Sequence, residues 1–383
     1  MRICLVSFSG FPDQGATYFY EMAYSLRRLG VAVDAIAVQR PGEAMRAVED
    51  GVHVTRVPMR LTMNWTSPAR WGRKLLFFAR VAATVRDGRY DIVHVYSTLG
   101  VFVLPLLAGR GPKWVQELQT GAVSSRSPIA RWLQDRARGL QGRAFDANLT
   151  VTKLLGERVF GRRALGVDTV PAGVNLAHFR PGLSREMREE LSIPADAIVF
   201  VHAGVLEAER ATDVVVRAFA RALEEDGRLW LLMPGKGRQL HDLRRMAQRL
   251  GVAPRVWLPG YVAYRTLPLV FAAADAGLSY LPAVSYYEGQ PPMKVMEYLA
   301  AALPVIASDV SSHRVLVRHE ENGLLAVPGE VGYTRAMRRF AAEPELRRRL
   351  AASARSSVSH LSYDRIASDR LLPVYRRLLQ QHG

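Results

Sequence analysis

The chain has 383 residues, of which 49% are hydrophobic and 23% are charged. This length suits two domains of roughly 150 to 200 residues each, and the composition excludes a disordered or collagen-like chain. The 52 Lys and Arg residues exceed the 35 Asp and Glu residues, which gives a net charge of +17. A basic surface attracts polyanions such as nucleic acid, anionic membrane or phosphorylated small molecules.

The basic excess lies mostly in the first half of the chain. Residues 1–180 carry 25 Lys and Arg against 13 Asp and Glu, net +12, whereas residues 181–383 carry 27 against 22, net +5. Only five of the basic residues are Lys, so a general bias toward Arg is a competing explanation for the charge. The single cysteine, Cys4, excludes an intrachain disulfide and a cysteine-cluster zinc site, and is typical of a reducing compartment.

Short apolar runs alternate with stretches of helical period in both halves. The first half has predicted strands at residues 2–8, 31–38, 91–96 and 113–118. A second series of strands is predicted at 197–204, 228–235, 255–260, 276–282 and 304–308. This alternation predicts an α/β fold of two doubly wound halves joined near residues 172–184, with ligands beyond the carboxyl ends of the parallel strands.

Two further segments indicate where the protein is located and how the chain ends. The longest uncharged apolar stretch, residues 95–109, is shorter than the roughly 20 residues of a bilayer span, and the chain begins directly with a strand. We therefore expect a cytoplasmic protein, at most peripheral on the cytoplasmic face of a membrane. Residues 361–383 have helical period, and Pro373 should kink or split that helix.

The most informative stretch is YYEGQPPMKVMEYLAAALPVIAS, residues 286–308. It predicts a loop, a helix opened by Pro291 and Pro292, and a strand. A helix start at the carboxyl edge of a parallel sheet attracts anions, and Lys294 in the first turn would add a point charge for phosphate. Glu297, on the same face, could accept hydrogen bonds from a ribose diol. An ordinary amphipathic helix with an exposed Lys–Glu pair remains equally compatible with these residues.

This stretch resembles the donor-binding helix of the retaining nucleotide-sugar glycosyltransferases of family four, which have the GT-B fold. The segments 169–181, 201–220, 232–262 and 361–379 resemble further parts of that family in the same order. The resemblance implies two Rossmann-like domains that face a central cleft. Residues 1–175 would bind the acceptor, 176–360 would bind the donor, and the C-terminal helix 361–383 would return to the first domain.

The resemblance also implies roles for individual residues. Arg210 and Lys294 would bind the diphosphate, Glu297 the ribose, and Val256 and Tyr261 the nucleobase. Glu288 would lie near the sugar hydroxyls, and His94 would point toward the cleft; these two, with Arg210 and Lys294, are the candidate catalytic residues. The remaining candidate donor contacts are Gly15, in the loop Gly10–Gly15, and Gly204, Gly289 and Met293. No metal or other cofactor is expected, in keeping with the missing Asp-x-Asp pair.

Three departures from the family pattern are visible. Val205 stands where an arginine usually follows the glycine of the second domain's first loop. Glu288 and Glu297 are nine residues apart instead of eight, with Gly289 at the expected place. The histidine often found after the fifth strand is absent, and Glu117 or Gln119 would substitute for it. His94 itself also fits the alternative of a hydrogen-bonded residue at a strand end.

Residues 62–88 combine aromatic and basic side chains in a way that is typical of a helix lying on an anionic membrane. These are Trp65, Trp71, Phe77 and Phe78 beside Arg70, Arg73, Lys74 and Arg80. The alternative, slightly favoured, is that the aromatic face packs on the first sheet and the cations are solvated. A second basic run favours a positive acceptor-side surface; its members are Arg126, Arg131, Arg136, Arg138 and Arg143.

These observations predict a retaining hexosyltransferase. It would transfer sugar from a UDP- or GDP-sugar to an acceptor hydroxyl, with a lipid-linked or cell-envelope glycan as one candidate acceptor. A nucleotide-sugar epimerase or a phosphorylase on the same fold is a second interpretation. A non-catalytic polyanion-binding protein is a third, although the sequence has no helix-turn-helix, zinc-finger or RNA-recognition signature and no nucleic-acid partner is expected.

Overall fold

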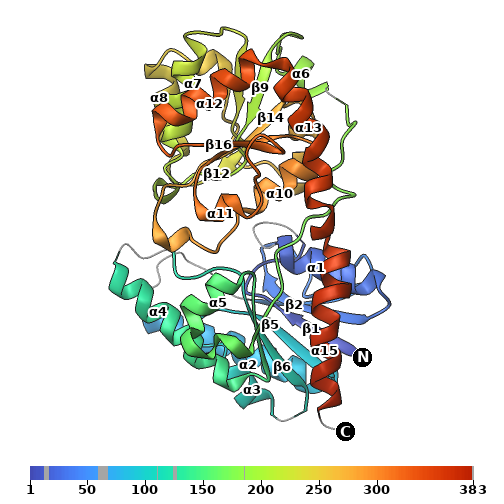
Figure 1. Cartoon of the computed structure of the whole chain (residues 1–383). Coiled ribbons are helices and arrows are strands. Elements are labelled where there is room, and N and C mark those ends of the chain that lie inside the picture. Colours follow the sequence, from blue (N-terminus) through green and yellow to red (C-terminus); the bar gives the residue numbers. More distant parts are fainter. Residues whose placement is uncertain (13–16, 59–67, 110, 124–126, 185, 382–383) are drawn as a thin grey trace. The chain divides into compact units, whose positions relative to one another are not determined.

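The chain forms two compact units in the computed structural model, which describes residues 1–12, 17–58, 68–109, 111–123, 127–184 and 186–381 (Figure 1). Unit 1 comprises Met1–Ala172 together with Tyr363–Gly383, and unit 2 comprises Gly173–Ser362. The sequence places the corresponding boundaries at 175/176 and 360/361. Residues 361–383 were predicted as a separate returning helix, and nearly all of them cluster with unit 1.

Unit 1 is built on an eight-stranded sheet in the order β3-β4-β2-β1-β5-β6-β7-β8. All neighbouring strands are parallel except the edge strand β3, which is antiparallel to β4. The strands are β1 (Arg2–Val6), β2 (Ala32–Gln39), β3 (Arg46–Glu49), β4 (Val52–Pro58), β5 (Ile92–Tyr96), β6 (Lys113–Leu118), β7 (Ala147–Thr150) and β8 (Val167–Thr169). Its principal helices are α1 (Thr17–Arg28), α2 (Pro68–Gly88), α3 (Val103–Ala108), α4 (Pro128–Gln141) and α5 (Lys153–Phe160).

Unit 2 is built on a six-stranded parallel sheet in the order β13-β11-β9-β14-β15-β16. The strands are β9 (Ile198–Val201), β11 (Leu229–Leu232), β13 (Val256–Trp257), β14 (Ala276–Ser279), β15 (Val305–Ser308) and β16 (Gly323–Ala326). The helices are α6 (Glu186–Glu190), α7 (Asp213–Leu223), α8 (Leu240–Arg249), α9 (Leu267–Ala272), α10 (Met293–Ala300), α11 (Ser311–Arg314), α12 (Glu330–Ala342) and α13 (Pro344–Val358). The α/β class and the doubly wound organisation predicted from the alternating pattern are confirmed.

Each sheet has one point where the winding reverses. In unit 1 the chain runs from β1 toward β4 on one side and from β5 toward β8 on the other. In unit 2 it runs from β9 to β13 and then from β14 to β16. Ligands of open α/β sheets bind outside the carboxyl ends of the strands at such a reversal. The junctions β1/β5 and β9/β14 are therefore where each unit should hold a ligand.

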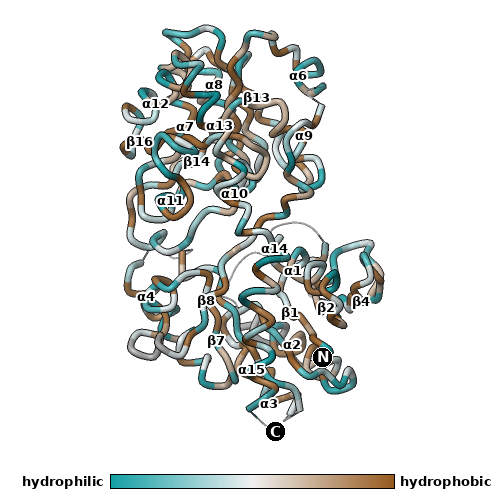
Figure 2. The backbone as a smooth tube through the Cα atoms, turned by 45° about the vertical axis from the view of Figure 1, so that its right-hand side comes forward, coloured by the Kyte–Doolittle hydropathy of each residue, from teal (hydrophilic) through white to brown (hydrophobic). Residues whose placement is uncertain are grey.

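The cores explain why these segments fold as they do. Hydrophobic residues follow the strands, while the helices mix hydrophobic and hydrophilic residues because one face is buried (Figure 2). In α2, Phe77 and Phe78 are each only 1% exposed and belong to the unit 1 core. For this part of residues 62–88 the packing alternative is confirmed. Trp65 lies outside the described residues, and the side chains of Trp71, Arg70 and Arg73 lie outside them as well.

The C-terminal segment ends the chain in three pieces. It consists of α14 (Tyr363–Ile366), a π-helical turn (Ala367–Leu371) and α15 (Leu372–Gln380). Pro373 lies in the first turn of α15, where a missing N–H costs least, so the predicted interruption of the helix occurs just before it. Within the described residues no helix has the length and apolar character needed to cross a bilayer.

Candidate functional site

The site in unit 2 begins at the end of β9, where the chain turns through residues 202–205. Gly204 has φ +128°, and a Cβ built there would lie 3.8 Å from Nζ of Lys294. The following two residues form a short strand, β10 (Gly204–Val205), parallel to β12 (Gly235–Lys236). Because a Cβ on Gly235 would come within 2.0 Å of the carbonyl oxygen of Gly204, only glycine permits this close approach. Backbone is thereby exposed beside the lysine.

Lys294 lies in the first turn of α10, the helix that a loop connects to β14. The prolines precede the helix: Pro292 is its N-cap with an extended backbone, and Met293 is the first helical residue. The Lys294 ammonium lies 3.2 Å from Nε2 of His202, which is fully buried. Two chain segments 92 residues apart thus meet at the β9/β14 reversal.

The electrostatics of this pair favour an anionic ligand. Burial, reinforced by the Arg210 cation, lowers the pKa of Lys294 to about 7, although Glu297 opposes the shift. Burial and the Lys294 ammonium hold the pKa of His202 well below its usual range, so a neutral ring accepts the hydrogen bond from lysine. Burial and a second cation both disfavour the charged form of Lys294. A diphosphate bound beside it would therefore stabilise the ammonium.

Tyr298 fixes α10 against the sheet. Its hydroxyl accepts a 2.7 Å hydrogen bond from the backbone N–H of Ala203, next to His202. Its ring lies over Gly277 of β14, where a Cβ would come within 2.2 Å of the ring. Since Tyr298 is fully buried, the helix start and the β9 loop are held as one rigid element.

Arg210 is held by an aromatic residue from the loop before α10. It ends the short 3₁₀ turn Ala208–Arg210, and its guanidinium carbon lies 5.7 Å from the centre of the Tyr287 ring. The Tyr287 hydroxyl donates a 3.0 Å hydrogen bond to the Glu209 carbonyl. The hydroxyl of Ser312 donates in turn to the Tyr287 carbonyl. Tyr287 therefore sets the position of the second cation.

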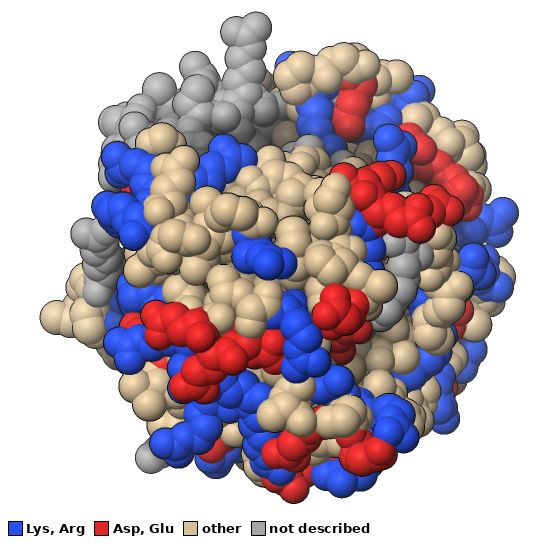
Figure 3. Space-filling model, turned by 90° about the horizontal axis from the view of Figure 1, so that it is seen from above, with Lys and Arg blue, Asp and Glu red and all other residues tan. Residues whose placement is uncertain are grey.

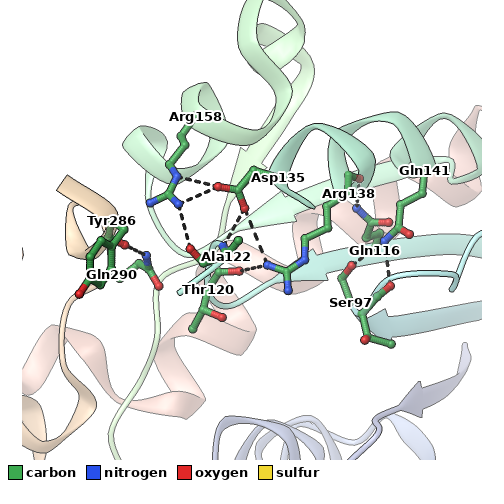
Figure 4. Close-up of polar contacts among 11 residues, drawn as sticks. Ser97, Gln116, Thr120, Ala122, Asp135, Arg138, Gln141, Arg158, Tyr286 and Gln290 are labelled. Atoms are coloured by element: carbon green, nitrogen blue, oxygen red, sulfur yellow. Dashed lines mark hydrogen bonds and ion pairs between the residues drawn. The ribbon is translucent and has the colours of Figure 1, made fainter. Parts of the chain in front are cut away.

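The same loop carries the predicted residues Glu288 and Gly289. Glu288 is exposed, and Gly289 is buried with φ +71°, a backbone conformation that favours glycine. The side chain of Gln290 donates a 2.6 Å hydrogen bond to the Tyr286 carbonyl, which stabilises the turn (Figure 4). The structure therefore presents Glu288 to solvent on an ordered loop.

The other predicted donor contacts lie at the same edge of the sheet or beside it. Met293 and Glu297 are half-buried on α10. Val205, which stands in place of the usual arginine and was not a predicted contact, is 44% exposed on β10. Val256 is on β13, paired with Leu231, and packs partly against the unit 2 core. Tyr261 is 43% exposed, and the Lys236 ammonium lies 5.1 Å from the centre of its ring.

His94 lies inside unit 1, contrary to the expectation that it points toward an open cleft. It is the middle residue of β5 and is fully buried. Its Nδ1 forms a 2.6 Å hydrogen bond with the hydroxyl of Tyr375 from α15, and its Nε2 lies 2.9 Å from the carboxylate of Glu117. This geometry favours the hydrogen-bonded structural role over the catalytic one, because the ring has no exposed surface.

Glu117 and Gln119, the proposed substitutes for the missing histidine, contact each other. The amide of Gln119 donates to the Glu117 carboxylate, which is buried beside His94. Gly15 lies outside the described residues. Gly10, at the start of the same loop, packs closely against the guanidinium of Arg40.

A second polar cluster lies beyond β5 and β6 in unit 1 (Figure 4). The buried carboxylate of Asp135 accepts hydrogen bonds from Arg158 at 2.8 Å and from the backbone of Ala122 at 2.7 Å. Arg138 donates to the Thr120 carbonyl at 3.1 Å and lies 3.9 Å from Asp135.

Lys74 of α2 adds a third cation to this cluster. Its ammonium donates to the Leu99 carbonyl in the loop after β5. Burial and the positive charge of Arg138 lower the pKa of Lys74 to about 8. The pKa of Arg138 is also lowered, mainly by burial and in part by Arg158. Arg138 and Arg158 thus contact the Asp135 carboxylate, while Lys74 and Arg138 repel each other.

Sequence reasoning did not find several residues that support these sites. Tyr287, Tyr298 and Ser312 act through contacts with distant segments, and nothing in their local sequence distinguishes them from core or loop residues. His202 lies within the predicted strand at residues 197–204, where the local sequence does not distinguish it from a core residue. Asp135 was hidden within a basic run, although a lone acid among arginines is itself a hint of pairing.

The comparisons with known proteins cover both units. Residues 184–357 match the family described as glycosyl transferases group 1, and residues 15–173 match the glycosyl transferase 4-like domain. A relative named D-inositol 3-phosphate glycosyltransferase from Saccharomonospora viridis is 27% identical, over 97% of this chain and 91% of its own. A protein of the same name from Actinosynnema mirum is 28% identical, over 96% and 93%.

Solved structures resemble this protein over nearly the whole chain. Sucrose-phosphate synthase from Thermosynechococcus elongatus has a TM-score of 0.77 at 20% identity, covering 99% of each chain. Anabaena HepE, solved with UDP and glucose, has a TM-score of 0.79 at 16% identity, covering 98% and 100%. The two family matches span both units and the neighbours share the fold, so the chain belongs to the glycosyl transferases group 1 family and is a GT-B fold glycosyltransferase that uses a nucleotide sugar.

Proposed function

We propose that the protein is a retaining hexosyltransferase that moves a sugar from a UDP-sugar to a hydroxyl group of a phosphorylated acceptor. One observation carries the donor half of this proposal: at the β9/β14 reversal of unit 2 the Lys294 ammonium lies 3.2 Å from His202, and burial together with the Arg210 cation lowers its pKa. A nucleoside diphosphate supplies the two adjacent negative charges that such a pair of cations would bind.

The proposed chemistry is stabilisation of the leaving diphosphate. The bond between the sugar C1 and the β-phosphate oxygen breaks, and the acceptor oxygen bonds to C1 on the same face. The acceptor proton passes to the departing phosphate. Lys294, Arg210 and the N-terminal backbone of α10 would stabilise the charge that develops on that phosphate. Glu297, near Lys294, would hold the ribose hydroxyls.

One observation supports uridine as the base, and a second indicates where a base would pack. Neighbours with this fold have been solved with UDP, with UDP and glucose, and with UDP-glucose. The exposed ring of Tyr261 follows β13 at the edge where a base would pack, beside Lys236. Stacking on an aromatic ring is tolerant of base identity, so the base would be read by backbone groups after β13.

The acceptor half of the proposal rests on the cation cluster of unit 1. Arg138 and Arg158 contact the Asp135 carboxylate, and Arg138 lies near enough to Lys74 to lower the pKa of that lysine. These side chains lie beyond the carboxyl ends of β5 and β6. A phosphate group would relieve the repulsion between Lys74 and Arg138. The relatives named D-inositol 3-phosphate glycosyltransferase are consistent with an acceptor of this class.

A donor panel tests the proposal. Thermal unfolding of the full chain is followed with UDP-, GDP- and ADP-sugars, and nucleoside diphosphate release is then measured with and without inositol phosphates. We expect the UDP-sugar to raise the unfolding temperature and release to require a phosphorylated acceptor. No stabilisation by any nucleotide sugar would refute the donor site. Conversion of the donor to another sugar without acceptor would instead indicate an epimerase.

A further inference from the structure

Helix α4 in unit 1 turns its apolar side chains outward. Ile129 is 71% exposed, Trp132 56%, Leu133 55% and Leu140 57%. Their spacing puts them on one face of the helix, with Arg136 between them. We call these five residues the α4 face. Ordinary surface helices present the opposite pattern, with the apolar stripe toward the core.

The inner side of the same helix is polar and tightly packed. Asp135 is 2% exposed and Gln141 7%. A Cβ on Gly139 would lie 2.4 Å from the Val159 carbonyl oxygen of α5, so the backbones of the two helices are almost in contact. The inward side is thus occupied by the ion-pair cluster described above. The fold of unit 1 therefore gives no reason for the four apolar residues on the outside.

The charges around the α4 face are mostly positive. Among the described residues of α4 the only acid is the buried Asp135, whereas Arg136 is exposed and lies 5.6 Å from the Trp132 ring. Arg143 and Lys153 are also exposed nearby in the chain, and Lys153 pairs with Glu157 at 3.9 Å. Leu154 on α5 is also 44% exposed.

We propose that the α4 face docks unit 1 on an anionic lipid bilayer. Ile129, Trp132, Leu133 and Leu140 would enter the boundary between headgroups and acyl chains. Arg136, Arg143 and Lys153 would contact lipid phosphates. Charge complementarity selects this partner, because a second copy of the chain would place one positive face against another. The docking is independent of sugar transfer and does not rest on the proposed function.

The α4 face lies on a different helix from residues 62–88, for which the sequence left membrane contact as the less favoured of two interpretations. Residues 62–88 combine aromatic and basic residues, yet Phe77 and Phe78 of α2 are buried in the core. The apolar residues of α4 lie among the arginines of the second basic run, and only their outward orientation distinguishes them from core residues.

Sedimentation of the full chain with vesicles tests the proposal. Phosphatidylcholine vesicles with and without phosphatidylglycerol are compared for the wild type, for Trp132→Ser with Leu133→Ser, and for Arg136→Glu. We expect binding only with phosphatidylglycerol and a loss of at least about tenfold in the double variant, since two apolar side chains would no longer be buried in the lipid. Arg136→Glu should bind more weakly and with less dependence on salt.

The matched control is Val331→Ser on α12 of unit 2, where the native residue is 63% exposed. It should bind vesicles as the wild type does. Unfolding temperature and UDP binding, measured on every variant, should stay unchanged, which separates docking from folding and from the donor site. The proposal is overturned if the wild type does not sediment with anionic vesicles or if the double variant still does. It is also overturned if light scattering shows a wild-type dimer that the double variant converts to a monomer.

Discussion

Both units are doubly wound, and they use positive charge in different ways. At the β9/β14 reversal of unit 2, Lys294 is partnered by a neutral histidine and repelled by Arg210. Beyond β5 and β6 of unit 1, Arg138 and Arg158 contact Asp135, and Lys74 is repelled by Arg138. The comparison teaches that a doubly wound sheet supplies the place for a ligand, while a few side chains decide which anion can bind there.

The surfaces of the two units also differ in how positive charge is balanced. Many exposed arginines of unit 2 form ion pairs, among them Arg217–Asp213, Arg228–Asp226, Arg238–Glu207, Arg314–Asp309 and Arg339–Glu343. Over the face drawn in Figure 3, basic and acidic side chains lie interspersed. Such exposed pairs contribute little to stability, but they leave unit 2 only mildly basic. The net +12 of residues 1–180 has fewer acids to offset it.

The largest effect should follow from Lys294→Ala. Removing the desolvated cation should weaken UDP binding and lower kcat/KM about a hundredfold, a size typical for loss of one group that stabilises developing charge. Titration calorimetry with UDP measures the binding. Arg245→Ala, which removes a surface cation of α8 paired with Asp242, serves as the control and should bind UDP normally. Equal binding by both variants would remove Lys294 from the donor site.

Arg138→Ala tests the unit 1 cluster. Losing one charge-assisted contact to a phosphate should raise the KM for a phosphorylated acceptor about tenfold or more, without changing UDP binding. Initial rates at varied acceptor concentration provide the measurement. Arg136→Ala, two residues away but on the outer face of α4, is the matched control. If both variants have the same KM, the acceptor site lies elsewhere.

Donor binding should weaken as pH rises. The pKa of Lys294 in the protein without ligand is about 7. Below pH 7 the ammonium is already present, whereas above pH 7 Lys294 must take up a proton when UDP binds. The dissociation constant of UDP should therefore rise up to about tenfold per pH unit above 7, until the pKa of the bound state is reached. Lys294→Arg should flatten this dependence, because arginine remains charged. If the dissociation constant of UDP for the wild type does not change between pH 6 and pH 9, the lowered pKa of Lys294 is contradicted.

The smallest effect concerns His94. Tyr375→Phe removes the hydroxyl bonded to Nδ1 of His94 and should lower the free energy of unfolding by about 1 kcal/mol. Chemical denaturation measures that change. Because His94 is buried, kcat should be unaffected; a large fall in kcat without loss of stability would instead support the catalytic role.

Much of the fold follows from local sequence, whereas the site depends on distant contacts. Residues 304–308 read as a strand because they are mostly apolar and begin with Pro304, and β15 spans Val305–Ser308. Strand β16 was missed because GLLA is too short to show a period. Lys294 could be singled out because a cation in a first helical turn is unusual.

The supporting residues could not be predicted in the same way. Tyr287 reaches Glu209 across 78 residues, and Tyr298 reaches Ala203 across 95, so neither contact leaves a local pattern. The outward face of α4 was equally hidden. A helix with one apolar stripe looks the same in sequence whether that stripe faces the core or the solvent, and the buried ion pairs of Asp135 decide the orientation.

The most direct test of the contrast between the units is a side-by-side measurement of UDP affinity and acceptor KM in Lys294→Ala and Arg138→Ala. The account predicts that Lys294→Ala loses UDP affinity while Arg138→Ala keeps it and loses only affinity for the phosphorylated acceptor. If Arg138→Ala weakens UDP binding as much as Lys294→Ala does, or if Lys294→Ala binds UDP like the wild type, the assignment of the two anions to the two units is wrong.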